Sequence, residues 1–163
     1  MEQQLRPRLL SPREGMHLWY LGSLSTIKAA GADTGGVLGQ WEELVAPGFE
    51  TPYHVHHKED EAFYVLEGEV EFIYQGQRFR GSPGAFVYLP RRIPHGFRVL
   101  GEQPARMLGT VFPAGFEQFF IDLSVPAKSM TLPPPSEPDI PRLIETARKY
   151  DVEILGPLAA AFG

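Results

Sequence analysis

The stretch from Gly48 to Gly68, GFETPYHVHHKEDEAFYVLEG, decides how the rest of the chain is interpreted. Side chains alternate between two faces along an extended chain, so His54 and His56 point the same way and His57 points the opposite way. Glu61 follows His56 after four residues, which is enough for a tight turn that returns its carboxylate to the imidazoles. The stretch therefore predicts three metal-binding side chains that lie close together.

A second pattern downstream supplies a third imidazole. Gly84 is followed by five residues and Pro90, and four further residues lead to His95 at the start of an apolar run. On a later strand, His95 can close the site from across the fold. Imidazole and carboxylate donors suit divalent Fe, Mn, Co, Ni, Cu or Zn, and the absence of cysteine excludes thiolate ligands. A His-x-His pair alone is more often structural, so the prediction of one divalent transition metal depends on the complete pattern.

Short β-type runs separated by Gly and Pro turns fill residues 37–112. The run 69–74, EVEFIY, alternates acidic and apolar residues, which is typical of an antiparallel strand with one buried face. Such closely spaced runs predict an all-β antiparallel sandwich or barrel. Residues 1–36 add an N-terminal segment with one or two strands that pack on this barrel, and the chain is expected to form one domain.

Residues 113–163 form a Pro-rich, partly helical C-terminal extension. Asp139 precedes an apolar stripe at helical spacing and is expected to cap a helix. The stripe consists of Leu143, Ile144, Ala147 and Tyr150. This stripe has to bury against the barrel of its own chain or against a second subunit, and a homodimer is expected.

The distribution of charge and apolar residues argues against several partners. The net charge is −5, the pI is near 5.5 and no run of Lys or Arg stands out, so no nucleic-acid partner is expected. Residues 1–14 lack the apolar core of a signal peptide, and no apolar stretch approaches the roughly 18 residues that span a bilayer. With no cysteine, the chain is expected to be a soluble, cytoplasmic protein without a membrane partner, binding a small molecule.

Together the two patterns resemble the signature of the cupin superfamily. The first, G-x5-H-x-H-x4-E-x6-G, is matched at every fixed position, and the second, usually G-x5-P-x-G-x2-H-x3-N, is matched at glycine, proline and histidine. Arg92 and Val99 stand where the second pattern has glycine and asparagine. The resemblance covers about residues 37–112 and implies a jelly-roll β-barrel. It also implies that one metal ion is held by His54, His56, Glu61 and His95.

Further stretches are similar to bacterial single-domain cupins that resemble quercetin dioxygenases. They include GADTGG at 31–36, GFEQFF at 115–120 and EILGP at 153–157. This resemblance implies an oxygenase that acts with dioxygen on a small hydroxylated substrate of the flavonol or enediol type. It also implies that the substrate binds the metal through its oxygen and that Glu61 is the catalytic general base.

The substrate pocket is expected to be apolar and aromatic, so that it can stack on a planar ring. Strand parity places Phe97 and Val99 on the face of His95. It likewise places Phe63 on the face of Glu61. The predicted lining residues are Phe63, Phe72, Phe97 and Val99.

Two alternative functions stay open. The same ligands and pocket would serve a non-enzymatic, metal-dependent protein that senses or sequesters a small molecule. They would also serve metal-assisted isomerisation or hydrolysis at a zinc-type centre. The remaining polar residues beside the ligands, His57, Glu59 and Asp60, are expected to form a solvated turn.

Overall fold

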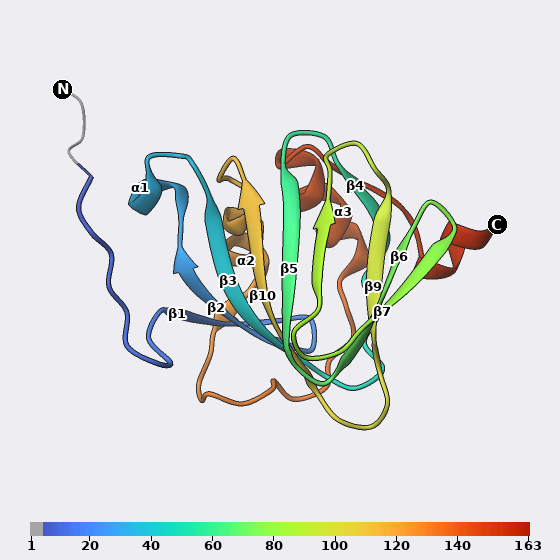
Figure 1. The fold of residues 1–163 in the computed structure, drawn as a ribbon, viewed down its shortest axis with the longest axis horizontal. Coiled ribbons are helices and arrows are strands. Elements are labelled where there is room, and N and C mark those ends of the chain that lie inside the picture. Colours follow the sequence, from blue (N-terminus) through green and yellow to red (C-terminus); the bar gives the residue numbers. More distant parts are fainter. Residues whose placement is uncertain (1–4) are drawn as a thin grey trace.

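The protein folds into two antiparallel sheets that face each other (Figure 1), as seen in a computed structural model that describes residues 5–163. The larger sheet has the strand order β11-β1-β2-β3-β10-β5-β8, and the smaller has the order β12-β4-β9-β6-β7. The strands of the larger sheet are β1 (Met16–Tyr20), β2 (Ser23–Ala29), β3 (Gly39–Val45), β5 (Asp60–Glu67), β8 (Phe86–Leu89), β10 (Ala105–Phe112) and β11 (Val125–Pro126). Those of the smaller sheet are β4 (Tyr53–His56), β6 (Glu69–Tyr74), β7 (Gln77–Gly81), β9 (His95–Leu100) and β12 (Val152–Gly156).

The predicted all-β jelly-roll class is confirmed, but the ring of strands is not closed. Over residues 5–163 the backbone ladders of the two sheets stay separate, with β8 and β11 at the edges of one sheet and β7 and β12 at the edges of the other. The expected barrel is therefore an open sandwich. Its two layers are held together by side-chain packing, since Phe63 of the larger sheet contacts Phe72 and Phe97 of the smaller one with ring centroids 5.7 Å apart in each pair.

The centre of the larger sheet is built around Gly109 on β10. Trp41 on β3 and Phe63 on β5 are its direct neighbours in the ladder, one on each side. A β-carbon at position 109 would lie 2.5 Å from two atoms of the Trp41 ring. The glycine thus leaves the space in which the fully buried indole lies.

The β6–β7 hairpin shows why the predicted turns fall where they do. Gln75 and Gly76 connect the two strands and have φ angles of 47° and 73°. Positive φ at both central residues matches the right-handed twist of the flanking strands. Of the alternating run ahead of this turn, Val70 and Phe72 are fully buried in the core, as predicted.

The C-terminal extension packs on its own chain. It contains α2 (Glu117–Leu123), α3 (Ile140–Lys149) and the 3-10 helix η1 (Leu158–Phe162), and a further short helix, α1 (Gly31–Thr34), precedes β3. Asp139 caps α3 as predicted, because its carboxylate accepts the backbone N–H of Arg142 at 3.0 Å. Leu143 and Ala147 on α3 are buried in the same apolar cluster as Phe119 on α2. Neither these helices nor any other within residues 5–163 is long and apolar enough to cross a membrane.

The homodimer and the cytoplasmic location expected from the sequence stay predictions. The helical stripe of α3 does not require a second subunit, because the chain buries it internally. Sedimentation of the purified protein would test the dimer directly.

Candidate metal centre

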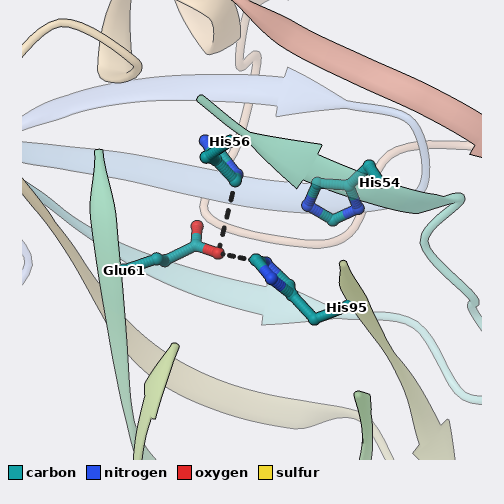
Figure 2. Close-up of side chains that lie close together, drawn as sticks. All are labelled: His54, His56, Glu61 and His95. Atoms are coloured by element: carbon teal, nitrogen blue, oxygen red, sulfur yellow. Dashed lines mark hydrogen bonds and ion pairs between the residues drawn. The ribbon is translucent and has the colours of Figure 1, made fainter. Parts of the chain in front are cut away.

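Three strands bring the four predicted ligands together at one end of the sandwich. β4 carries two of the histidines, β5 carries the glutamate next to its first residue, and β9 begins with the third histidine. Figure 2 shows all four side chains converging on one point, and their donor atoms lie within 4.8 Å of one another. These residues are His54, His56, Glu61 and His95. Among residues 5–163 they are the group whose geometry can hold a metal ion.

The strand pairing explains this convergence. His54 and His95 are direct partners in the β4–β9 ladder, and their ring centroids are 4.6 Å apart. His56 lies two residues further along the same face, as the alternation rule predicts, and its ring is nearly parallel to that of His95 at 5.6 Å. Glu61 approaches from the opposite sheet. The site is therefore enclosed between the two layers.

Backbone carbonyls set the orientation of two imidazoles. The Nδ1–H groups of His54 and His95 donate to the carbonyls of Pro52 and Ile93 at 2.8 and 2.9 Å. A carbonyl only accepts, so the proton resides on Nδ1 and the other nitrogen, Nε2, is free for a further contact. Such outer hydrogen bonds commonly orient metal-ligating histidines.

The inward atoms form a set of donors that needs a shared cation. Nε2 of His95 lies 3.0 Å from a carboxylate oxygen of Glu61, and Nε2 of His56 lies 3.7 Å from the same oxygen. In neutral imidazoles of this orientation the facing atoms carry lone pairs, which repel unless a proton or a metal ion lies between them. Both ring nitrogens of the buried His56 lack a hydrogen-bond partner within residues 5–163. Donors bound to a transition metal at about 2.0–2.2 Å lie roughly 3–4.4 Å apart, so small side-chain shifts bring this group, spread over at most 4.8 Å, onto a divalent ion.

The protonation states also suit metal binding. Burial, together with the neighbouring charges of His95 and His56, lowers the pKa of His54 to about 3. Burial raises the pKa of Glu61, but the neighbouring imidazoles of His56 and His95 outweigh it and lower the pKa to about 2. At neutral pH the site therefore offers a neutral imidazole and an ionised carboxylate, the forms that ligate metals.

The turn between the ligands was expected to be solvated, and Glu59 shows that this expectation is wrong for one of its residues. Its side chain is buried, and one carboxylate oxygen lies 3.6 Å from Nδ1 of His56. This distance is too long for a hydrogen bond, but it makes Glu59 the carboxylate that lies beside the outward nitrogen of His56. His57 behaves as predicted: its side chain is 47% exposed, faces away from the site and contacts Glu153 at 3.0 Å. Strand parity cannot distinguish Glu59 from a solvated residue, because it lies in the turn between β4 and β5.

Arg92, which replaces the usual glycine of the cupin pattern, lies in the turn before His95 and keeps the backbone conformation of that glycine. Arg92 adopts φ of 67°, the left-handed conformation for which glycine is usual at this position. Its backbone N–H donates to the carbonyl of His56 at 2.7 Å, and the neighbouring Arg91 pairs with Asp60 at 3.0 Å. The turn is thus tied to both β4 and β5, which fixes the start of the strand that carries the third histidine.

We expect Arg92→Gly to raise the stability of the protein slightly. Left-handed backbone costs an ordinary residue about 1–2 kcal/mol, whereas glycine loses roughly 0.5–1 kcal/mol through its freer unfolded chain, so the net gain is up to about 1 kcal/mol. Urea denaturation measures it. Arg92→Ala is the matched control, because it removes the same exposed side chain and keeps the conformational cost. A glycine variant less stable than the alanine variant would contradict this account.

A cavity of about 910 Å³ opens onto the metal-binding group. Two of the predicted pocket residues, Phe63 and Phe97, line it, together with three of the four ligands. Phe72 and Val99 do not; both are packed in the core behind the lining. Parity assigns a residue to a face of its strand, but not to the empty or the filled part of the space between two sheets. Contact of any of these residues with a substrate stays a prediction.

Several cavity residues were not among those predicted from the sequence. They come from β1, β3, α2 and the extended segment before α3, and include Tyr20, Trp41, Glu43, Phe116, Phe120, Leu132 and Pro135. Phe116 packs edge-on against His56 with centroids 4.4 Å apart. The C-terminal extension therefore forms part of the cavity wall, which no local pattern in the chain indicates.

Glu43 is a second buried carboxyl group in this cavity. It is only 4% exposed, and burial raises its pKa to about 7, although Ser23 and Trp41 partly counteract the shift. The charge of Glu61 adds to the increase.

We expect Glu43→Gln to gain stability relative to the wild type as the pH rises from 4.5 to 8. In this window the unfolded chain loses the Glu43 proton first, while the folded chain keeps it until about pH 7, so wild-type stability falls. Glutamine does not titrate. The difference in unfolding free energy between Glu43→Gln and the wild type should grow by about 1–2 kcal/mol. This is less than the full pKa shift corresponds to, because water reaches the cavity. Urea denaturation at pH 5 and pH 8 measures it, with the outward-facing Glu42→Gln as control. An equal difference at both pH values would contradict the shift.

Comparison with known proteins agrees with the fold. Residues 41–111 match the family described as Cupin_2, cupin domain. The chain is 28% identical over 152 residues to quercetin 2,3-dioxygenase of Bacillus subtilis, which covers 93% of this chain and 45% of that protein. The chain spans about half the length of the curated relatives that it matches, between 45% and 58%.

Solved structures show the same fold. KdgF from Halomonas sp. is similar with a TM-score of 0.54 and 24% identity, over 60% of this chain and 84% of that one. An RmlC-like cupin from Shewanella frigidimarina reaches a TM-score of 0.56 at 19% identity, over 66% of this chain and 93% of that one. The solved structures share the fold, and the cupin-domain match over residues 41–111 together with the dioxygenase relative supports a cupin superfamily protein.

Proposed function

We propose that this protein binds one divalent transition metal and oxygenates a small hydroxylated substrate, of the flavonol or enediol type, with dioxygen. The proposed ligands are His54, His56, Glu61 and His95. The observation that carries the proposal is the convergence of these four donors, three of which line a large cavity that is otherwise mainly apolar. The similarity to quercetin 2,3-dioxygenase over 93% of the chain supports the choice of substrate class.

The cavity suits a planar substrate with rings. Its volume of about 910 Å³ is at the upper end of the roughly 300–1,000 Å³ typical of small-molecule sites. Phe63, Phe97 and Phe116 present aromatic surfaces next to the metal-binding group. These rings can stack on the substrate and keep bulk water from the reacting atoms.

Glu61 is the proposed general base. Its carboxylate is ionised, buried and part of the cavity wall, so the group is positioned to accept the proton of a substrate hydroxyl that enters the cavity. When bound, the metal supplies a Lewis-acid and redox centre beside this carboxylate. Nε2 of His95 lies 3.0 Å from one of its oxygens, so the imidazole limits the positions that the carboxylate can take.

Metal analysis combined with oxygen uptake tests the proposal. The purified protein is reloaded separately with Fe, Mn, Co, Ni, Cu and Zn, and dioxygen consumption is followed with a panel of flavonols and enediols, starting with quercetin. We expect uptake that matches substrate loss and stops when the metal is chelated. Glu61→Gln should lower the rate by about 100-fold or more, as for loss of a general base, whereas Glu42→Gln on the outer face should not change it.

Two outcomes would overturn this proposal. A redox-active metal that binds tightly without oxygen uptake on any substrate identifies a metal-dependent binding or sensing protein. Exclusive retention of zinc by protein isolated from its native source identifies metal-assisted isomerisation or hydrolysis.

A further inference from the structure

Glu43 lies in the same cavity as the proposed metal centre but at a distance from it. Through β10, Glu61 on β5 is level with Gly39 on β3, since both pair with Val111. Glu43 is four residues further along β3, which corresponds to roughly 13 Å along the strand. Both side chains lean toward the cavity, and the charge on Glu61 influences that of Glu43. The cavity thus has two polar regions separated by apolar walls.

Within residues 5–163, no hydrogen bond of normal geometry reaches the carboxyl group of Glu43, although Ser23 and Trp41 lie near enough to lower its pKa. The hydroxyl of Ser23, one of its two neighbouring donors, already donates to the carbonyl of Tyr20 at 2.7 Å. The other donor, Nε1 of Trp41, is buried without a hydrogen-bond partner of normal geometry.

Glu117 shows how this chain treats a buried glutamate with a structural role. Its carboxylate accepts the backbone N–H groups of Gly31 and Gly115, both at 2.7 Å. It also lies outside the cavity lining. Buried polar groups are normally hydrogen-bonded, and one that is left without partners in a cavity is a candidate for contact with a ligand. Glu43 differs from Glu117 in both respects.

We infer that Glu43 is a second substrate contact, whose carboxyl group binds a hydroxyl at the end of the substrate remote from the metal centre. The inference rests on the proposed function and narrows it: the substrate is an elongated planar polyphenol with hydroxyls near both ends. The metal-binding group holds one end and Glu43 the other, with the apolar walls around the rings between them. A substrate with polar groups at one end only would leave Glu43 buried and unpaired, which disfavours its binding.

Two flavonols that differ only at the remote rings test this inference. Quercetin and 3-hydroxyflavone share the hydroxyl and carbonyl pair that would reach the metal, and 3-hydroxyflavone lacks the other ring hydroxyls. Their dissociation constants are measured anaerobically with the metal-loaded protein, by quenching of tryptophan fluorescence. We expect Glu43→Leu to raise the dissociation constant of quercetin by about tenfold, which corresponds to the loss of one buried hydrogen bond. The dissociation constant of 3-hydroxyflavone should change by less than about twofold.

Matched variants separate binding from folding. Glu42→Leu changes the neighbouring carboxylate, which pairs with Arg106 on the outer face of the sheet, and should affect neither ligand. Glu43→Gln keeps hydrogen-bonding atoms and should retain most of the preference for quercetin. If circular dichroism shows that Glu43→Leu is unfolded, the unbranched Glu43→Met takes its place with the same expectations.

The outcomes are distinguishable from those of the proposed function. If Glu43→Leu weakens the binding of both flavonols equally, or changes the binding of neither, Glu43 is structural. The inference is then overturned, while flavonol binding itself stands. If the wild type binds neither flavonol, the proposed function and the inference both fail.

Discussion

His95→Ala is expected to remove the metal from the protein. The change deletes one of four donors, the imidazole nitrogen that lies 3.0 Å from Glu61. Loss of an outer-shell contact alone typically weakens metal binding by about 10–100-fold, so loss of a direct ligand should weaken it by roughly 100-fold or more. Metal content by mass spectrometry and competition with a chromophoric chelator measure the loss. The fold should persist, because the core between the sheets is untouched.

His57→Ala is the matched control for this variant. It removes an imidazole directly after the strand that carries two of the ligands, and the His57 side chain pairs with the exposed Glu153, away from the site. Metal content should stay at the wild-type level. Unchanged metal content in His95→Ala as well would remove His95 from the site and leave the proposed coordination without its third imidazole.

Gly109→Val is expected to be the most destabilising single change in the sheets. Valine is a favourable residue in strands, so the backbone does not oppose it. The new side chain, however, would enter the space of the Trp41 ring, whose atoms lie 2.5 Å from the position of the β-carbon. Trp41 is also confined by Phe63, Phe116 and Phe120. Overpacking of this kind costs about 3 kcal/mol of unfolding free energy, which urea denaturation measures.

Thr110→Val serves as the control for the glycine variant. It introduces the same side chain one position along β10, on the outer face, and it loses only a half-buried hydrogen bond from Gln40. The expected cost is about 1 kcal/mol or less. If both variants lose the same stability, the indole is not confined in the way the structure indicates.

Spacing rules predict the metal-binding group because they depend on local geometry. Alternation along β4 places His54 and His56 on one face, and the structure has them there, with His57 on the other. Their partnership with His95 is long-range, and the resemblance to the cupin pattern supplied it. The ligand roles themselves stay predictions until metal is measured.

The cavity was predicted less well, for a physical reason. Its walls combine segments more than a hundred residues apart, such as Tyr20 on β1 and Pro135 before α3, and their proximity is set by the packing of the whole sandwich. Alternation along β3 correctly places Trp41 and Glu43 on the face that points between the two sheets. No local pattern, however, shows that the space between the sheets is partly empty there.

β12 was also missed, although it lies directly against the metal-binding strand. It pairs with β4 so that Ile154 is opposite His54 and Val152 is opposite His56. Only five residues long and placed after a helix, it carries little periodic signal of its own.

The pairing of β12 with β4 makes the far end of the chain a determinant of chemistry at residues 54 and 56. β4 has β9 on one side and β12 on the other, and a shortened variant that stops after α3 would turn the ligand strand into a bare sheet edge, free to slip or to pair with other chains. A fragment that ends before β12 would thus contain all four donors, but the register of the strand that carries His54 and His56 would no longer be fixed on that side.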